Sequence, residues 1–343
     1  MSGPRVLGIE STCDETAAAI VRGRQVLSNV VASQVAKHAH FGGVVPEVAG
    51  RAHVEAIVGV VKQAMADAQV DAGQLDAIAV AHRPGLIGSL VIGTTAAKAL
   101  SLVFDRPIVA VDHVKAHLHS VRIFADGEPE HDPPLPAVGL VVSGGHTSLY
   151  HVADWLDVRR IGRTIDDAVG EAYDKAAAML GLGYPGGPII DKLAQTGDGT
   201  SLKLPRPMLG PTSLDFSFSG LKTALLYAVF GDKGRARTLA DVNQQEIADA
   251  AASFQASCVE TIVKKLRRAV DQTSAKSVVL GGGVSANHGL RKAVREQLDV
   301  PAFVPAWPYC TDNAAMIAGL GARQFVSGDV AALDFLAEST VRD

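Results

Sequence analysis

Residues 6–21, VLGIESTCDETAAAIV, and residues 138–152, VGLVVSGGHTSLYHV, share one order of features. Each begins with an apolar run typical of a buried strand, passes through a turn of small polar residues and returns into a second apolar run. Ser11 and Ser143 hold equivalent places in the two turns. The pattern predicts a duplicated fold that grips a ligand between its halves; chance similarity is the alternative.

Short β-branched runs alternate with helical patterns along the rest of the chain, as in α/β proteins with mixed or parallel sheets. The expected strands are residues 6–10, 17–21, 77–81, 108–111, 138–142, 149–152 and 277–280. The expected helices are residues 46–69, 89–104, 113–124, 167–180, 244–272, 288–298 and 311–326. In the longest of them, Cys258 lies on the apolar stripe, so we assign it to packing.

Residues 125–136, ADGEPEHDPPLP, interrupt this alternation. Their proline and acidic residues suit neither a sheet nor a core. We therefore expect an N-terminal lobe at residues 1–124, a linker at 125–136 and a C-terminal lobe at 137–343, whose last helix can pack back on the first lobe.

Composition limits the function classes. The chain has 343 residues, of which 48% are hydrophobic, with a formal charge of -4. This charge excludes a generally basic surface, so any nucleic acid must be held by a local basic patch or with partner proteins. Three scattered cysteines exclude a disulfide framework and indicate a reducing compartment. Without a signal-peptide pattern or an uninterrupted membrane-length apolar run, we expect a cytoplasmic protein that spans no membrane.

A candidate metal site lies in DHVKAHLHS, where His113 and His117 stand at positions i and i+4 on one helix face. Asp312, in PYCTDNAAMIAG, offers a third ligand. Two histidines and one carboxylate suit Fe(II) or Zn(II). A solvated or helix-capping histidine pair and an ordinary N-terminal helix aspartate are the alternatives. Val114 stands where a metalloprotease of the HExxH type has its glutamate.

Glycine-rich turns supply a second set of candidates. SGGHT at residues 143–147 and GGGVSAN at residues 281–287 each follow a strand, where glycine lets backbone amides approach an anion. A tight strand-to-helix turn is the equally simple alternative. In GLGYPGGPIID, Asp191 can accept hydrogen bonds from ribose hydroxyls or act as a first-turn carboxylate.

The turn ESTCDET gathers Glu10, Asp14 and Glu15. Its carboxylates can position an amine nucleophile or accept its proton, although adjacent acids in a turn are usually solvated. Cys13 has no neighbouring histidine or lysine in the sequence to activate it. We therefore favour Asp14 and Glu15 over Cys13 as catalytic residues.

Taken together, these motifs resemble the TsaD family of tRNA threonylcarbamoyladenosine transferases, formerly called O-sialoglycoprotein endopeptidases. The resemblance covers nearly the whole chain. It rests on GIESTCDETAAA, FGGVVPEVA, DHVKAH, SGGHT, IDDAVGEAYDKAAAMLGLGYPGGP, PRPM, DFSFSGLKTA, GGGVSAN and CTDNAAMIAG. His82 and Arg83, before PGL, depart from the family pattern and put the shape of that loop in doubt.

The resemblance implies a two-lobed, duplicated fold of the actin, sugar kinase and Hsp70 (ASKHA) type with a nucleotide cleft. It implies one divalent metal ion, Fe(II) favoured and Zn(II) second, bound by His113, His117 and Asp312 across the gap between the lobes. The implied adenylate contacts are Val141, Val142, Ser143, Gly144, Gly145, Asp174, Gly187, Asp191 and Asn287. Asp14 and Glu15 are the implied acids on the acceptor side.

The implied reaction moves the threonylcarbamoyl group from threonylcarbamoyl-AMP to the adenosine at position 37 of tRNAs that read ANN codons, releasing AMP. The implied partners are a TsaB-like paralogue and a TsaE-like ATPase. Residues 46–69, with Val54, Ile57, Val58 and Val61 on one face, are a candidate docking surface, with burial in the core as the alternative. A metal-dependent peptidase, a small-molecule kinase of this fold and a non-enzymatic scaffold are the alternative functions.

Overall fold

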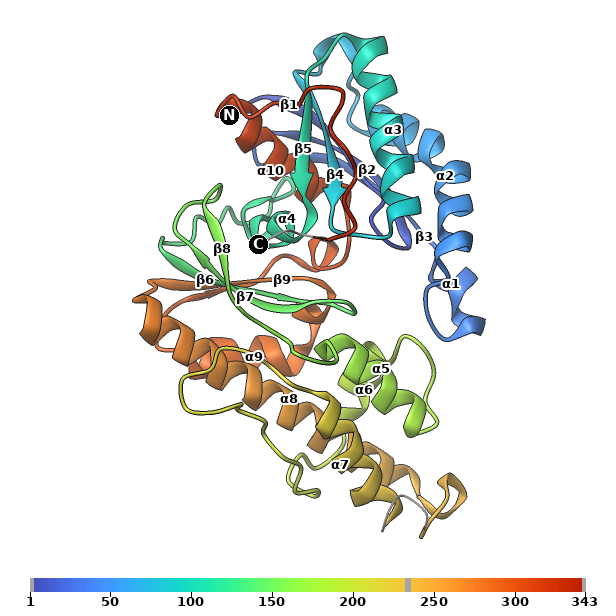
Figure 1. Cartoon of the computed structure of the whole chain (residues 1–343), viewed down its shortest axis with the longest axis vertical. Coiled ribbons are helices and arrows are strands. Elements are labelled where there is room, and N and C mark those ends of the chain that lie inside the picture. The colour runs from blue at the N-terminus through green and yellow to red at the C-terminus, as the bar shows by residue number, and fades with distance from the viewer. Residues whose placement is uncertain (1–2, 232–235, 341–343) are drawn as a thin grey trace. The chain divides into compact units, whose positions relative to one another are not determined.

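The computed structural model describes residues 3–231 and 236–340. The chain divides into two compact units, of which the first combines Met1–Asp132 with Pro305–Asp343 and the second is Pro133–Val304 (Figure 1). The division falls inside the expected linker. The expected second lobe ended at residue 343, whereas residues 305–343 group with the first unit. Within this segment α10 (Ala314–Val326) packs on the first sheet, in line with the expectation that the last helix packs back on the first lobe.

The first unit is built on a mixed five-stranded sheet in the order β3-β2-β1-β4-β5. Its strands are β1 (Arg5–Glu10), β2 (Glu15–Arg22), β3 (Gln25–Ser33), β4 (Ala77–Arg83) and β5 (Ile108–Asp112). The first three form an antiparallel meander, and β4 and β5 run parallel to β1. The other helices of this unit are α1 (Val35–His38), α2 (Pro46–Asp67), α3 (Ile87–Phe104) and α4 (His113–His119).

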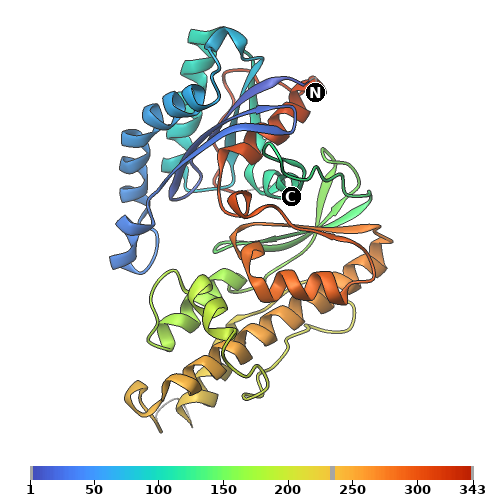
Figure 2. The same ribbon diagram turned by 180° about the vertical axis from the view of Figure 1, so that it is seen from behind.

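Successive side chains of β1 point to opposite faces of this sheet, and different helices cover the two faces. Leu7 and Ile9 point into an apolar cluster with residues of α2 and α3. Gly8 points the other way, toward α10, which lies over the strands in Figure 2. A β-carbon at residue 8 would meet the carbonyl of Ala314 and would lie 2.8 Å from the β-carbon of Ala318. The helix therefore approaches the backbone of the strand directly.

The second unit repeats this topology. Its sheet order is β10-β9-β6-β7-β8, with an antiparallel β6-β7-β8 meander and parallel β9 and β10. The strands are β6 (Ala137–Val142), β7 (Thr147–Val152), β8 (Val158–Arg163), β9 (Ser277–Gly281) and β10 (Ala302–Phe303). The matching strand orders of the two sheets confirm the duplicated α/β fold.

Within the described residues, the α-helices of the second unit are α5 (Val169–Met179), α6 (Gly186–Ala194), α7 (Ser219–Phe230), α8 (Gln244–Thr273) and α9 (His288–Gln297). Of these, α8 packs on strands β6, β7 and β9. The 30-residue α8 contributes Phe254, Ile262 and Leu266 to the core of the unit. Cys258 is fully buried in the same core, which confirms its assignment to packing.

The edge strands β3, β8 and β10 escaped the sequence analysis, whereas the largely buried edge strand β5 was predicted at residues 108–111. The edge strand β8 reads VRRIGR and is only partly buried, so it lacks the continuous apolar run of a central strand. β3 was missed for the same reason, since its outer half is half-exposed. The expected helix 113–124 is also shorter, because α4 ends at His119 and a 3-10 turn, η3 (Ser120–Arg122), follows.

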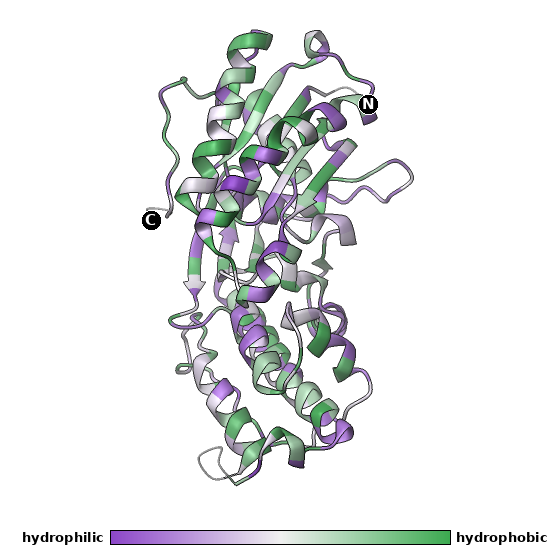
Figure 3. Ribbon diagram, turned by 90° about the vertical axis from the view of Figure 1, so that its right-hand side faces the viewer, coloured by the Kyte–Doolittle hydropathy of each residue, from purple (hydrophilic) through white to green (hydrophobic). Residues whose placement is uncertain are grey.

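Among the described residues, one helix, α3, is long and apolar enough to cross a membrane by length and composition. It also packs on β4 and α2 within the first unit. Figure 3 shows polar and apolar residues side by side along most helices. A single helix of this kind is weak evidence for a membrane protein, and the expectation of no membrane span stays a prediction.

The close approach of α10 to β1 predicts the effect of Gly8→Ala. The added methyl group has no space, so α10 must shift, and we expect the free energy of unfolding to fall by about 1–3 kcal/mol. Urea denaturation measures this change. The control is Gly59→Ala in α2, where nothing lies within 4 Å and alanine should stabilise the helix by about 0.5–1 kcal/mol. Equal changes in the free energy of unfolding for Gly8→Ala and Gly59→Ala would contradict the close packing of α10 on β1.

Candidate metal centre and nucleotide-type site

The start of α4 is fixed by Asp112, the last residue of β5. Its carboxylate accepts hydrogen bonds from the backbone N–H groups of Val114 and Lys115, at 3.0 and 3.1 Å, which caps the helix. His113 and His117 then lie one turn apart on the same face, with ring centroids 4.6 Å apart. Both imidazoles are buried, so the alternative of a solvated histidine pair is wrong.

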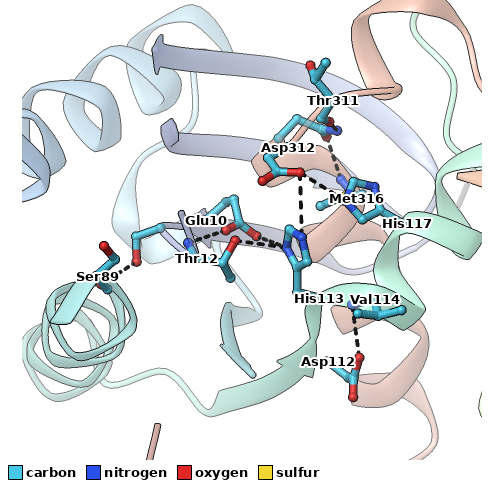
Figure 4. Close-up of polar contacts among 12 residues, drawn as sticks. Glu10, Thr12, Ser89, Asp112, His113, Val114, His117, Thr311, Asp312 and Met316 are labelled. Carbon is cyan, nitrogen blue, oxygen red and sulfur yellow. Dashed lines mark hydrogen bonds and ion pairs between the residues drawn. The ribbon is translucent and has the colours of Figure 1, made fainter. Parts of the chain in front are cut away.

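Asp312 reaches these rings from the C-terminal part of the chain. We expected it inside a helix at residues 311–326, but α10 begins at Ala314 and Asn313 caps it. The Asp312 carboxylate is therefore not needed as a cap. Its Oδ1 lies 3.1 Å from Nε2 of His117 and 3.6 Å from Nε2 of His113 (Figure 4).

Glu10, at the end of β1, orients His113. The Nδ1 atom of His113 lies 2.8 Å from Oε2 of Glu10, and the other carboxylate oxygen accepts a 2.6 Å hydrogen bond from the backbone N–H of Thr12. Glu10 is fully buried. The sequence analysis grouped Glu10 with the turn carboxylates that can act on an amine and did not foresee that it orients His113; a carboxylate at the end of a buried strand was the available signal.

The electrostatic surroundings of the two histidines differ. Burial opposes the charged form of both rings, yet the carboxylates of Glu10 and Asp312 raise the pKa of His113 to about 9. For His117, burial prevails and lowers the pKa, although the hydrogen bond to Asp312 opposes this shift. The Nδ1 atom of His117 has no hydrogen-bond partner among the described residues.

These three side chains fit one metal ion. The ligand atoms of His113, His117 and Asp312 all lie within 4.8 Å of one another, and they comprise two imidazole nitrogens and one carboxylate oxygen. The carboxylate behind His113 is the outer-shell partner that metal-binding histidines ordinarily have. The cluster is compatible with a single metal site.

All three candidate ligands belong to the first unit. The expectation that they come from both lobes is wrong, because residues 305–343 pack on the first sheet.

The turn after β1 holds the candidate acids Asp14 and Glu15. Burial, together with the nearby Asp312 and Asp14, raises the pKa of Glu15 to about 10. Burial and the same carboxylates raise the pKa of the Cys13 thiol, which disfavours the thiolate that a nucleophilic cysteine needs. The buried ring of His53 supports the turn, since its Nε2 lies 2.9 Å from the carbonyl oxygen of Cys13.

His82 and Arg83, which depart from the family pattern, end β4 beside α4. Nε of Arg83 lies 3.3 Å from Oδ2 of Asp112, the residue that caps α4. The backbone carbonyl of His82 accepts a hydrogen bond from the N–H of Glu338. The side chains contribute as well, since Nδ1 of His82 lies 3.3 Å from the carbonyl oxygen of Leu336 and Arg83 lies 3.7 Å from Glu338. This departure therefore ties β4 to the capping residue of α4 and to the C-terminal segment.

In the second unit, the turn after β6 is closed by Ser143 and His146. The N–H of Ser143 donates to the carbonyl of His146, and the Ser143 hydroxyl accepts from the His146 N–H. Gly144 and Gly145 are exposed, with no atom within 4 Å of the position of a β-carbon. Val141 and Val142 are fully buried sheet residues, so their side chains do not line an open site.

The other candidate adenylate residues form two polar groups. Asp174 of α5 accepts a 2.7 Å hydrogen bond from the N–H of Gly186, at the start of α6 and next to Gly187. Asp191 and Asn287 are joined through Gln255, whose side-chain amide donates to Asp191 and accepts from Asn287, at 3.1 and 2.7 Å.

Gln255 was missed by the sequence analysis. It lies in the apolar-patterned α8, and only the tertiary structure brings it between Asp191 and Asn287. Asn287 also caps α9 by accepting from the N–H of Leu290.

Comparison with known proteins identifies the family. Residues 25–319 match the family model described as TsaD: tRNA N6-adenosine threonylcarbamoyltransferase. A relative of that name from Syntrophotalea carbinolica is 45% identical over 97% of this chain and 95% of its own length. Another, from Bacillus subtilis, is 47% identical over 96% of this chain and 93% of its own length. These relatives do not favour a peptidase or a small-molecule kinase.

Solved structures agree on the fold. The T. kodakarensis HypF structure has a TM-score of 0.60 at 16% identity, covering 95% of this chain and 48% of that one. Component A of the Acidaminococcus fermentans (R)-2-hydroxyglutaryl-CoA dehydratase has a TM-score of 0.52 at 14% identity, covering 94% of this chain and 99% of that one. Both support the actin-like, sugar kinase-like fold. From the family match and its near full-length relatives, we conclude that the chain belongs to the TsaD family of tRNA N6-adenosine threonylcarbamoyltransferases, which are acyltransferases that modify tRNA.

Proposed function

We propose that His113, His117 and Asp312 hold one divalent metal ion and that this centre serves the transfer of a threonylcarbamoyl group. The observation that carries the proposal is the convergence of three ligand atoms within 4.8 Å, backed by the buried Glu10. Two imidazoles and one carboxylate with open positions favour Fe(II), with Zn(II) as the alternative. When bound, the cation would polarise the carbonyl group of the donor.

The donor in this proposal is threonylcarbamoyl-AMP. The N6 amine of adenosine 37, in tRNAs that read ANN codons, attacks the carbamoyl carbon. A carbon–nitrogen bond forms, the carbon–oxygen bond to the phosphate breaks, and AMP leaves with the electron pair. Because AMP is a good leaving group, the site needs mostly positioning and charge stabilisation.

Asp14 and Glu15 act on the acceptor amine. Burial, together with Asp312 and Asp14, raises the pKa of Glu15. We assign to Asp14 and Glu15 the orientation of the N6 amine and the acceptance of its proton.

The second unit binds the adenylate part of the donor. The exposed turn at Gly144 and Gly145, beside Ser143, suits a phosphate. The start of α6 is already bound by the Asp174 carboxylate, so we assign Asp174 and Gly187 to the uncharged adenosine part of the donor. Asp191 accepts hydrogen bonds from the ribose hydroxyls, and Asn287 borders the same place, both held by Gln255. Val141 and Val142 contribute only backbone groups.

A TsaB-like paralogue and a TsaE-like ATPase are the proposed partners, in the cytoplasm. The expected docking surface on α2 divides into two parts. Ile57 and Val61 are core residues, whereas Val54 and Val58 are 61% and 60% exposed. We assign the exposed pair to contact with the TsaB-like partner, together with the exposed Val91 of α3, the helix that packs on α2.

One assay tests the whole proposal. The protein is incubated with labelled threonylcarbamoyl-AMP and unmodified tRNA, with and without the two partners. Label in tRNA is the expected result. Cleavage of peptides or net ATP turnover without labelled tRNA would overturn it.

His113→Ala should abolish stoichiometric metal binding and lower the transfer rate at least about 100-fold, since even outer-shell changes cost up to that factor. Metal analysis by mass spectrometry and the labelled-tRNA assay measure the two effects. His151→Ala, on β7 in the second unit, is the matched control and should retain both properties. Transfer at the unaltered rate by His113→Ala would discredit the metal centre.

Glu10→Gln tests the orienting role of the carboxylate. It preserves the shape of the side chain but weakens its bond to Nδ1 of His113, so metal affinity should fall about 10-fold to 100-fold. Competition with a chelator measures the affinity. The exposed Glu296→Gln on α9 is the control. Metal affinity equal to that of the control would show that Glu10 only fills space.

Val54→Glu with Val58→Glu should prevent binding of the TsaB-like partner, because two charges would be buried at an apolar contact. Size-exclusion chromatography of the mixed proteins measures complex formation. The control is Tyr227→Glu on α7, which replaces another exposed apolar side chain. Complex formation by the double variant would exclude this surface.

A further inference from the structure

A cavity of about 460 Å³ lies within the first unit, apart from the three candidate metal ligands. Its walls come from the β2–β3 turn, from η3 with the following residues and from α10. The side chains that matter here are Arg22, Arg24, His119, Arg122, Glu130 and Arg323. We call this the arginine cavity.

The backbone gathers these arginines from distant parts of the sequence. Arg22 and Arg24 flank Gly23, which turns the β2–β3 hairpin at a φ of 64°, a conformation that favours glycine. Arg122 ends η3, and Arg323 lies in the last turn of α10. A chain with a formal charge of -4 thus gathers four guanidinium groups around one cavity.

The adjoining acidic segment contributes two carboxylates to this group of arginines. Glu130 pairs with Arg24, and Asp132 lies 2.8 Å from Arg122 and 3.6 Å from Arg24. The two carboxylates belong to the stretch first expected to be a plain linker. Glu130 and Asp132 are 45% and 68% exposed, so these pairs are of the weak, exchangeable kind.

Two observations indicate that the cavity suits a further anion. Nε of Arg22 is buried and has no hydrogen-bond partner among the described residues. Burial and then the neighbouring Arg24 lower the pKa of Arg122, with Arg323 acting in the same direction, so the guanidinium groups repel one another. An anion between them would relieve this repulsion.

Phosphate is the anion that this geometry fits best, since forked guanidinium donors match its oxygens. The family acts on tRNA, and a chain without a general excess of basic residues needs a local patch to hold it. Helix α4 connects the cavity with the candidate metal site. His119, which lines the cavity, and His113, a candidate ligand, lie at its two ends, about 9 Å apart at 1.5 Å per residue. We propose that the arginine cavity binds a backbone phosphate of the tRNA substrate.

The test measures binding of unmodified tRNA by filter retention over a series of salt concentrations. Arg22→Gln with Arg323→Gln should weaken binding about tenfold and reduce the slope of log K against log salt by about 1. Glu130→Gln removes the carboxylate that competes with phosphate for Arg24 and should therefore strengthen tRNA binding. If the arginines only stabilised the fold, this substitution would not strengthen binding. Lys62→Gln with Arg106→Gln, which removes the same charge outside the cavity, is the control.

A second arm uses inorganic phosphate, with binding measured by calorimetry. Weaker phosphate binding by the arginine variant with unchanged tRNA binding would overturn tRNA as the occupant in favour of a free phosphate compound. Binding equal to that of the control in both arms would overturn the site itself. Thermal melting checks that each variant is folded. Because both arms omit donor and added metal, their failure leaves the proposed metal centre untouched.

Discussion

The candidate metal centre depends on the close packing of α10 against the first sheet. Gly8 in β1 and Gly321 in α10 leave no space for β-carbons, because Ala314, Ala318 and Ala79 already occupy the contact. Small residues let the helix approach the strand backbone, and this approach places Asp312, just before α10, beside His113 and His117, which lie on α4. A side chain 195 positions away from His117 thereby becomes its neighbour.

The same packing concentrates negative charge. Glu10 and Asp312 lie beside two buried imidazoles and raise the pKa of His113. Burial, followed by Asp312 and Asp14, raises the pKa of Glu15 in the neighbouring turn. Positive charge at this place would stabilise the carboxylates. A divalent cation would supply that charge. The first unit thus contains two opposite electrostatic environments, an acidic one at the start of α4 and a basic one at the arginine cavity.

Much of the fold was predictable from the chain. Central strands such as β1 and β6 are buried on both faces, so their apolar runs are distinct in the sequence. The edge strand β8 is only partly buried and carries three arginines, so no apolar run marks it in the sequence, unlike the buried edge strand β5. Among the site residues, Gln255 and the orienting role of Glu10 escaped, since such a role is defined by a partner far away in sequence.

The sequence by itself determined the duplicated α/β pattern, the family resemblance and the spacing of His113 and His117, because helix periodicity is a local property. Tertiary structure alone decided that Asp312 belongs to the first unit, that Val141 and Val142 are core residues and that four arginines share a cavity. The physical reason is that these facts depend on which distant segments pack together, and that choice is made by the shapes of whole helix and sheet faces.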